Sequence, residues 1–199
     1  MERFERLTAP ALPWPQVNCD TDQIIPARFL QKLRSEDFGT FLFADLRLRP
    51  DGMPVPDFPL HIPALRGARI LVAGRNFGCG SSREHAVWAL HDYGFRAVLA
   101  PSFGDIFFNN SLKNGLLPVV LPDHVVLVLL DRLAAEPGTL LTVDLPAQLV
   151  HGPDGATHPF DIDPFSRECL LQGLDELGYT LSLSDDIAAF ERDHGRSTP

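Results

Sequence analysis

The stretch from Gly74 to Ala86, GRNFGCGSSREHA, combines hydroxyl groups, a guanidinium group and glycines within a short run of the sequence. Ser81 and Ser82 offer hydroxyl groups, and Arg83 offers a planar guanidinium group that can bind a carboxylate through two parallel hydrogen bonds. The three glycines of the stretch allow positive φ and a close approach of the backbone to a ligand. A helix that begins just after the serines would favour an anion there, through its free N–H groups and its dipole. The stretch therefore predicts a small-anion site with hydroxyl groups beside it.

Two regular elements should flank this loop. The apolar run Ile70–Ala73 ends at a glycine, as a buried strand does. Downstream, apolar residues recur at helical spacing, and Gly94 then stands where a helix cap is expected. These positions are Ala86, Ala89, Leu90 and Tyr93. The predicted local order is strand, glycine loop, helix.

A purely structural interpretation of the serines also fits the pattern. Ser81 and Glu84 have the spacing of a capping box, in which the serine caps the helix and the glutamate reaches back to the serine N–H. Other motifs fit poorly, because the glycines do not give G-x-G-x-x-G, no Gly-Lys-Ser/Thr follows, and G-x-S-x-G is absent. One serine could serve in both the cap and the anion site, so both interpretations stay open.

Composition narrows the class of protein. The chain has 199 residues with 45% hydrophobic content, enough for one core, and we expect a single domain over 1–199. The formal net charge of −9 argues against nucleic acid and anionic membranes as partners. A small anionic substrate remains compatible with this charge, provided that arginines create a local positive potential.

Cysteine and histidine usage bears on compartment and metal binding. Cys19, Cys79 and Cys169 are far apart, odd in number and form no C-x-x-C pair, which suggests a reducing cytosol. The seven histidines include no H-E-x-x-H pattern, so we predict no metal ligand in this chain. The start of the chain lacks the pattern of a signal peptide, and the longest apolar run, 125–130, is too short to span a bilayer. A cytoplasmic protein is expected.

The first forty residues predict little regular structure. Residues 1–18 are rich in proline and suggest an extended lead-in. Asp20 and Asp22 would share a face if their segment were extended, and could then hold a metal or orient a base, although a surface turn is also consistent. Residues 29–33 favour a short helix, and the loop at about 31–40 is expected to be flexible.

The remainder alternates between strand and helix patterns, which predicts an α/β fold with a sheet and flanking helices. We expect a helix around 125–130 with Asp123 as a candidate N-cap. The tail 194–199 is expected to fray. The expected strands are 97–100, 116–121, 140–145, 148–151 and 157–160, and the other expected helices are 103–113, 164–172 and 185–192.

Several motifs carry a resemblance that extends over nearly the whole chain. GRNFGCGSSREHA is followed by WAL, DYGF, APSF, DIF and GLLPV; CDTDQIIPARFL lies at 19–30 and GLDELGYTLSLSDDIAAFE at 173–191. Together they resemble the small subunits of bacterial isopropylmalate isomerase. The resemblance implies the fold of the aconitase swivelling domain, a β/β/α arrangement with a mixed sheet or barrel and flanking helices.

The resemblance also implies an activity and roles for residues. The family interconverts 2-isopropylmalate and 3-isopropylmalate through 2-isopropylmaleate in leucine biosynthesis, which is hydro-lyase chemistry. Ser81 would be the base and Arg83 would bind a substrate carboxylate, with Ser82 and Gly80 completing the anion site. Asp22 would face the active site and orient its neighbours.

The segment after Asp22 helps the family to choose the substrate side chain. Phe29 and Leu30 are our candidates for an apolar wall, unless they are plain core residues. A homoaconitase or citramalate-type small subunit is an alternative, and Lys32 or Arg34 could bind a third carboxylate. A non-catalytic anion-binding module is a further alternative.

The resemblance further implies a partner. The family uses a four-iron four-sulfur cluster, and three scattered cysteines are a poor ligand set for one. The cluster is therefore expected on a separate large subunit, without which this chain should be inactive. Cys79 is interpreted as a partly buried thiol without a role, and Arg75, Glu84 and His85 as supporting, capping or interface residues.

Overall fold

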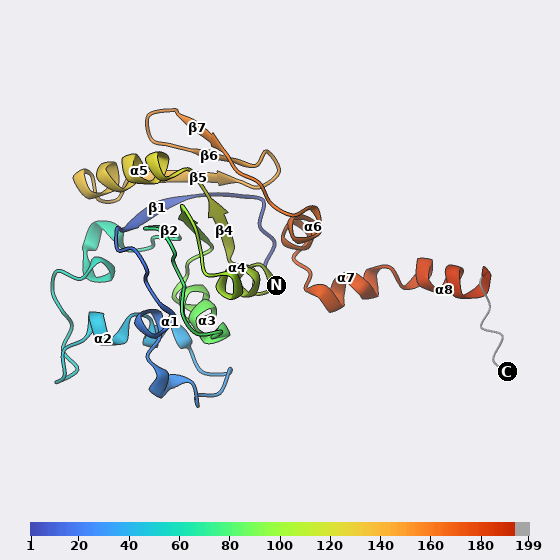
Figure 1. Ribbon diagram of the computed structural model, residues 1–199, viewed down its shortest axis with the longest axis horizontal. Helices are drawn as coiled ribbons and strands as arrows, with labels where there is room; N and C mark the ends of the chain where they lie inside the picture. Colours follow the sequence, from blue (N-terminus) through green and yellow to red (C-terminus); the bar gives the residue numbers. More distant parts are fainter. Residues whose placement is uncertain (194–199) are drawn as a thin grey trace.

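The computed structural model describes residues 1–193, which are built around one seven-stranded mixed sheet (Figure 1). The order across the sheet is β4-β3-β2-β1-β5-β6-β7, where β1 to β4 are parallel and β5 to β7 continue antiparallel from β1. The strands are β1 Arg6–Trp14, β2 Ile70–Ala73, β3 Ala97–Ala100, β4 Leu117–Val120, β5 Leu140–Asp144, β6 Leu149–His151 and β7 Thr157–Pro159. The predicted mixed sheet with flanking helices is confirmed.

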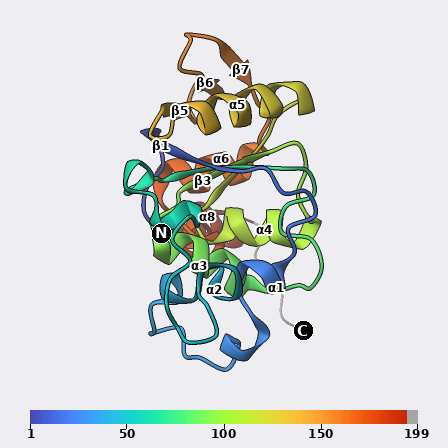
Figure 2. The ribbon, with the colours of Figure 1, turned by 90° about the vertical axis from the view of Figure 1, so that its left-hand side faces the viewer.

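The helices cover both faces of the sheet, with α5 on one face and α3 and α4 on the other (Figures 1 and 2). They are α1 Thr21–Ile24, α2 Ala44–Arg47, α3 Glu84–Tyr93, α4 Asp105–Lys113, α5 Asp123–Ala135, α6 Pro164–Gln172, α7 Glu176–Ser182 and α8 Ser184–Asp193. Short 3-10 turns lie at Ala27–Phe29, Phe38–Phe41, Pro59–His61 and Pro63–Leu65.

Alternate residues of β2 explain the two layers. Ile70 and Val72 are fully buried in the core under α5, whereas Leu71 and Ala73 are fully buried in the core with α3 and α4. Successive side chains of a strand point to opposite faces, so a strand covered by helices on both sides must be apolar throughout. This is why the run reads ILVA with no polar position.

The lead-in over 1–18 is extended, as predicted, but its middle is a regular element that was not predicted, the central strand β1. The prolines are tolerated by the way in which β1 changes partner: residues 6–10 pair with β5 and residues 11–14 with β2. Trp14 O accepts a hydrogen bond from Gly74 N–H, so the backbone of Trp14 faces β2. The backbone nitrogen of Pro13, the preceding residue, therefore faces the opposite side of the strand, where β5 has already ended. No ladder donor is lost there.

Helix ends marked by proline or glycine were predicted well, and others less so. α6 runs from Pro164 to Gln172 with Gly173 in the left-handed region, and α3 ends at Gly94. Asp123 is the first residue of α5 rather than its cap, which is Pro122. The helix α7 was not predicted.

In the part of the chain that the structure describes, no helix is long and apolar enough to cross a membrane. The predicted fraying of 194–199 lies outside the described residues.

Candidate active site

The carboxyl ends of β1, β2 and β3 meet at one edge of the sheet, where their loops bind each other. Asn18 donates its backbone N–H to Arg75 O at 2.8 Å, and Asn76 Nδ2 donates to Asn18 Oδ1 at 2.9 Å. Ser102, after β3, accepts the Asn76 N–H through Oγ at 3.0 Å. Parallel strands end together, and the crevice outside their carboxyl ends is the common ligand site of such sheets. The loop that carries the serines starts here.

Glycine is required in this loop for two reasons. Gly78 has φ +71°, and a Cβ on it would lie 2.2 Å from the ring of Phe107. Gly80 has φ +92° but has open space, with Asp20 Cβ the nearest atom at 3.5 Å. The predicted positive φ is thus present at Gly78 and Gly80 but not at Gly74. Close packing requires glycine at Gly78 and also at Gly74, where a Cβ would lie 2.5 Å from Gln16 O.

The segment after β1 fastens the serine loop from the other side. Thr21 donates its backbone N–H to Cys79 O at 3.0 Å, and its hydroxyl to Ser81 O at 3.2 Å. Gly78 N–H donates to Cys19 O at 2.7 Å. Because Thr21 is only 1% exposed, it holds the carbonyl groups on both sides of Gly80 in a buried frame.

Asp20 and Asp22 do not share an extended face, because their segment forms the short helix α1. The Asp20 carboxylate accepts the Gln23 N–H at 2.8 Å, and Gln23 Oε1 accepts the Asp20 N–H at 3.0 Å, which is a capping box. Asp22 instead accepts a hydrogen bond from Arg83 Nη1. The Asp20 carboxylate therefore caps α1, whereas the Asp22 carboxylate binds the arginine of the serine loop.

The capping-box interpretation of Ser81 was wrong. α3 begins at Glu84 with Arg83 in the cap position, and no side chain caps it. Glu84 accepts a bond from Asn114 Nδ2 at 2.7 Å rather than reaching back to the serine. Ser81 and Ser82 are exposed, and within residues 1–193 neither hydroxyl has a protein partner. Two free hydroxyls thus stand at the electropositive start of a ten-residue helix.

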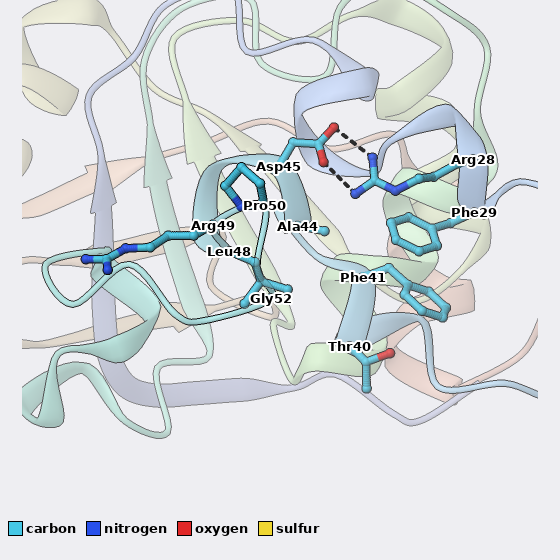
Figure 3. A pocket seen from close by; sticks show the side chains of 10 residues that line it. All are labelled: Arg28, Phe29, Thr40, Phe41, Ala44, Asp45, Leu48, Arg49, Pro50 and Gly52. Atoms are coloured by element: carbon cyan, nitrogen blue, oxygen red, sulfur yellow. Dashed lines mark hydrogen bonds and ion pairs between the residues drawn. The ribbon is translucent and has the colours of Figure 1, made fainter.

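The structure brings Asp22, Gly80, Ser81, Ser82 and Arg83 together, but it places Phe29 in a different surrounding. The Phe29 ring stacks on Phe41, with centroids 4.3 Å apart, and lines an open cavity of about 660 Å³ (Figure 3). Arg28 and Asp45 form a bidentate ion pair at this cavity, and neither serine lines it. Leu30 is half-buried, and its backbone lies against the ring of His85 near the start of α3.

The two cations considered for a third carboxylate are already paired. Lys32 Nζ lies 3.1 Å from Glu36, and Arg34 makes two bonds to Asp92, at 2.8 and 3.0 Å. Arg75 pairs with Asp123 at 2.6 Å, on α5. Of the arginines considered, Arg83 is the one that the structure holds beside the serines.

Comparison with known proteins places this geometry in a family. The aconitase C-terminal domain model matches residues 1–124, and the LeuD model matches residues 128–164. A 3-isopropylmalate dehydratase small subunit from Paramagnetospirillum magneticum is 53% identical over the whole chain and 99% of its own length. One from Parvibaculum lavamentivorans is 50% identical over 96% of each chain. The chain belongs to the 3-isopropylmalate dehydratase small-subunit family.

A solved structure agrees with this assignment. The crystal structure of 3-isopropylmalate dehydratase (leuD) from Methanocaldococcus jannaschii superposes with a TM-score of 0.67 at 26% identity, and covers 94% of this chain and 99% of its own. The aconitase-type fold expected of a 3-isopropylmalate dehydratase small subunit is therefore the fold observed.

The donor groups of this chain do not suit a metal cluster. Burial raises the pKa of the Cys19 thiol to about 12, and burial also raises the pKa of Cys79, so both stay protonated at neutral pH. Cys169 is buried on α6, in another part of the fold. Among residues 1–193, no three side chains of His, Cys, Asp or Glu are grouped to hold a metal ion.

Sequence reasoning missed two residues that support the site. Thr21 lay inside the motif that predicted Asp22, but a buried threonine that binds a loop sixty residues away leaves no local pattern. Gln23 did leave one, since Asp20 and Gln23 have the spacing of a capping box. That pattern would have predicted α1 rather than an extended segment.

Proposed function

We propose that this chain is the small subunit of a two-chain hydro-lyase that interconverts 2-isopropylmalate and 3-isopropylmalate through 2-isopropylmaleate in leucine biosynthesis. The observation that carries the proposal is the group formed by Ser81, Ser82 and Arg83 at the start of α3, with Asp22 bound to the guanidinium. Family membership supports the reaction, and the chemistry of these side chains supports the roles that follow.

Ser81 is the base in this proposal. In the dehydration of 2-isopropylmalate, the Ser81 Oγ alkoxide takes the proton from C3, beside the carboxylate, and the hydroxyl group leaves C2 as hydroxide. Hydroxide and the proton held by Ser81 together make up the water that is lost, which restores the alkoxide. The reverse addition, in the opposite sense, puts the hydroxyl on C3 and returns the proton to C2. A serine alkoxide is costly at neutral pH unless positive charge stabilises it. The N–H groups at the start of α3 and the nearby Arg83 supply that charge.

Arg83 binds a substrate carboxylate. Its side chain is 19% exposed, and Asp22 occupies Nη1, so the other N–H donors of the fork remain for a ligand. An ion pair with Asp22 also fixes the direction of the fork before substrate arrives, which lowers the entropy cost of binding. Gly80 and Ser82 complete the anion site, because Gly80 lets the backbone turn here at φ +92° without a side chain in the way.

The substrate assignment has one structural argument in its favour. A tricarboxylate such as homocitrate needs a further cation, and both candidates are already bound to acids, Lys32 to Glu36 and Arg34 to Asp92. Their occupation favours a dicarboxylate with an apolar substituent. Leu30, near the start of α3, remains our candidate for the wall that meets it, whereas Phe29 lines the separate cavity with Phe41.

The partner follows from the ligand set. Since the cysteines and histidines of this chain do not suit a four-iron four-sulfur cluster, we assign the cluster of the family to a large subunit. The three unpaired thiols also support a reducing compartment, and we place the enzyme in the cytoplasm.

The test is to mix this chain anaerobically with a large subunit that carries a reconstituted cluster, and to follow hydration of 2-isopropylmaleate. Each chain alone is the control. Hydration of 2-isopropylmaleate by the mixture, but by neither chain alone, supports the proposal. Hydration of methylmaleate or homoaconitate instead of 2-isopropylmaleate supports the alternative substrates. A stable complex with an intact cluster and no turnover on any of them leaves the non-catalytic anion-binding module.

A further inference from the structure

The segment 31–40 is fastened to α3 by an ion pair between Arg34 and Asp92. The guanidinium makes two hydrogen bonds to the carboxylate, at 2.8 and 3.0 Å, in the planar geometry that gives arginine pairs their strength. The same carboxylate accepts the Phe38 N–H at 3.2 Å. The Asp92 side chain, 16% exposed, therefore binds the segment at two points, Arg34 and Phe38.

Two aromatic rings lie near the guanidinium group of this ion pair. The Arg34 guanidinium lies 5.1 Å from the ring of Trp88 and 5.9 Å from that of Phe38. Phe38 is fully buried and packs edge-on against Trp88, with centroids 5.4 Å apart. Gly39 lies so close to α3 that a Cβ on it would be 2.6 Å from Tyr93 N. The segment and the helix thus form one packed unit.

The position of this unit relates it to the site. The segment follows Leu30 directly, and α3 follows Arg83 directly. Leu30 lies against His85, which is two residues from Arg83. The packing of the segment on α3 thus bears on how the candidate apolar wall lies relative to the carboxylate-binding arginine.

We propose that Arg34 and Asp92 are specificity-determining positioning residues, whose ion pair holds residues 31–40 on α3 and so sets the size of the apolar subsite between Leu30 and Arg83. This inference rests on the proposed function. The subsite takes a branched alkyl substituent on a dicarboxylate. Neither residue touches the reacting atoms; both act through the placement of Leu30.

A second ion pair in the same segment supplies a matched control. Lys32 Nζ lies 3.1 Å from Glu36 and 5.9 Å from the centroid of the Phe41 ring. It combines an ion pair with a ring contact, as Arg34 does, but its partners all lie within residues 32–41. Lys32→Gln therefore removes a similar charge pair without releasing the segment from α3.

The first measurement uses this chain alone and follows amide hydrogen exchange in residues 31–40. Asp92→Asn should speed exchange there at least about tenfold, because the segment opens more often when its ion pair is lost, whereas Lys32→Gln should change it less than about twofold. Unchanged exchange in Asp92→Asn, with the rest of the fold intact, overturns the proposal.

The second measurement uses the two-chain enzyme with 2-isopropylmaleate and with methylmaleate. Arg34→Gln and Asp92→Asn should each raise KM for the isopropyl substrate about tenfold with kcat little changed, and should affect the methyl substrate much less. The double variant should be no worse than either single variant, because the two residues act as one pair. Equal KM changes for both substrates, or additive losses, overturn the specificity role.

The two measurements separate the inference from the function on which it rests. If the wild-type mixture fails to hydrate 2-isopropylmaleate, the proposed function fails and the specificity role falls with it. The exchange measurement needs no activity, and it still decides whether the ion pair holds the segment.

Discussion

Ser81 and Ser82 are neighbours with different surroundings. The Ser81 carbonyl accepts two hydrogen bonds, from the Thr21 hydroxyl at 3.2 Å and from the Arg83 N–H at 2.8 Å. No such pair of bonds holds the Ser82 carbonyl among the described residues. The backbone of Ser81 is thus the better fixed of the two, which agrees with the role proposed for it, since a base must be held in place to meet one particular proton.

Replacing Thr21 tests this frame. Thr21→Val keeps the shape but removes the hydroxyl, which leaves Ser81 O with one partner, so kcat should fall about tenfold as the serine loses its position. The free energy of unfolding should fall by about 1 kcal/mol. Steady-state kinetics of the two-chain enzyme and urea denaturation of this chain measure the two effects.

Thr21→Ser is the matched control, since it restores the donor. It should recover most of the kcat lost in Thr21→Val. If Thr21→Val keeps full activity, the hydrogen bond to Ser81 has no part in positioning the base.

The loop and the helix that carry the serines were predicted in part from local signals. Strand β2 and helix α3 were predicted from hydrophobic periodicity and glycine stops, because those signals are local. Asp22 and Arg83 are far apart in the sequence, so no local pattern predicts their contact. Only the family resemblance placed both residues at one site. An extended conformation was predicted for 1–18, but β1 was not predicted as a strand, because proline has no N–H to donate to a sheet. Pro13 is tolerated because its nitrogen faces a side of β1 where β5 has already ended.

Two glycines of the loop should respond differently to alanine. In Gly78→Ala the new Cβ would lie 2.2 Å from the Phe107 ring at φ +71°, so we expect a loss of more than about 3 kcal/mol in the free energy of unfolding. Gly80→Ala meets no close atom and should cost only the backbone strain, about 1 kcal/mol. Thermal denaturation of both variants checks the order, and equal losses would contradict it.

The imidazole of His91, on the last turn of α3, should make the free energy of unfolding depend on pH. Burial, followed by the nearby Arg96, lowers the pKa of His91 below its ordinary value of 6.5, so the folded chain keeps the ring neutral. Below that ordinary value the unfolded chain takes up a proton that the folded chain refuses, and the free energy of unfolding falls as the pH drops from about 7 to 5. Urea denaturation across this range should show a shallower fall in His91→Gln. An unchanged pH dependence in the variant would contradict the assignment.

At the scale of the whole molecule, the proposed function makes this chain one half of an active site. Ser81, Ser82 and Arg83 supply hydroxyl groups and a guanidinium group at the start of α3, but the residues described contain no grouped metal ligands. Membership of the small-subunit family agrees with a division of labour between two chains. The overall fold was predictable because its motifs extend along the chain, whereas the fastening of 31–40 by Arg34 and Asp92 was not, since the pair joins residues 58 apart.

The most direct test of the account compares Ser81→Ala with Ser82→Ala in the assembled two-chain enzyme, with hydration of 2-isopropylmaleate as the readout and subunit binding measured in parallel. If Ser81 is the base, Ser81→Ala should lower kcat by about 10³-fold, within the range for a lost general base, with subunit binding intact. Ser82→Ala should act mainly on KM, because it removes only part of the anion site. A Ser81→Ala enzyme that retains kcat within a few-fold of wild type would contradict the central claim.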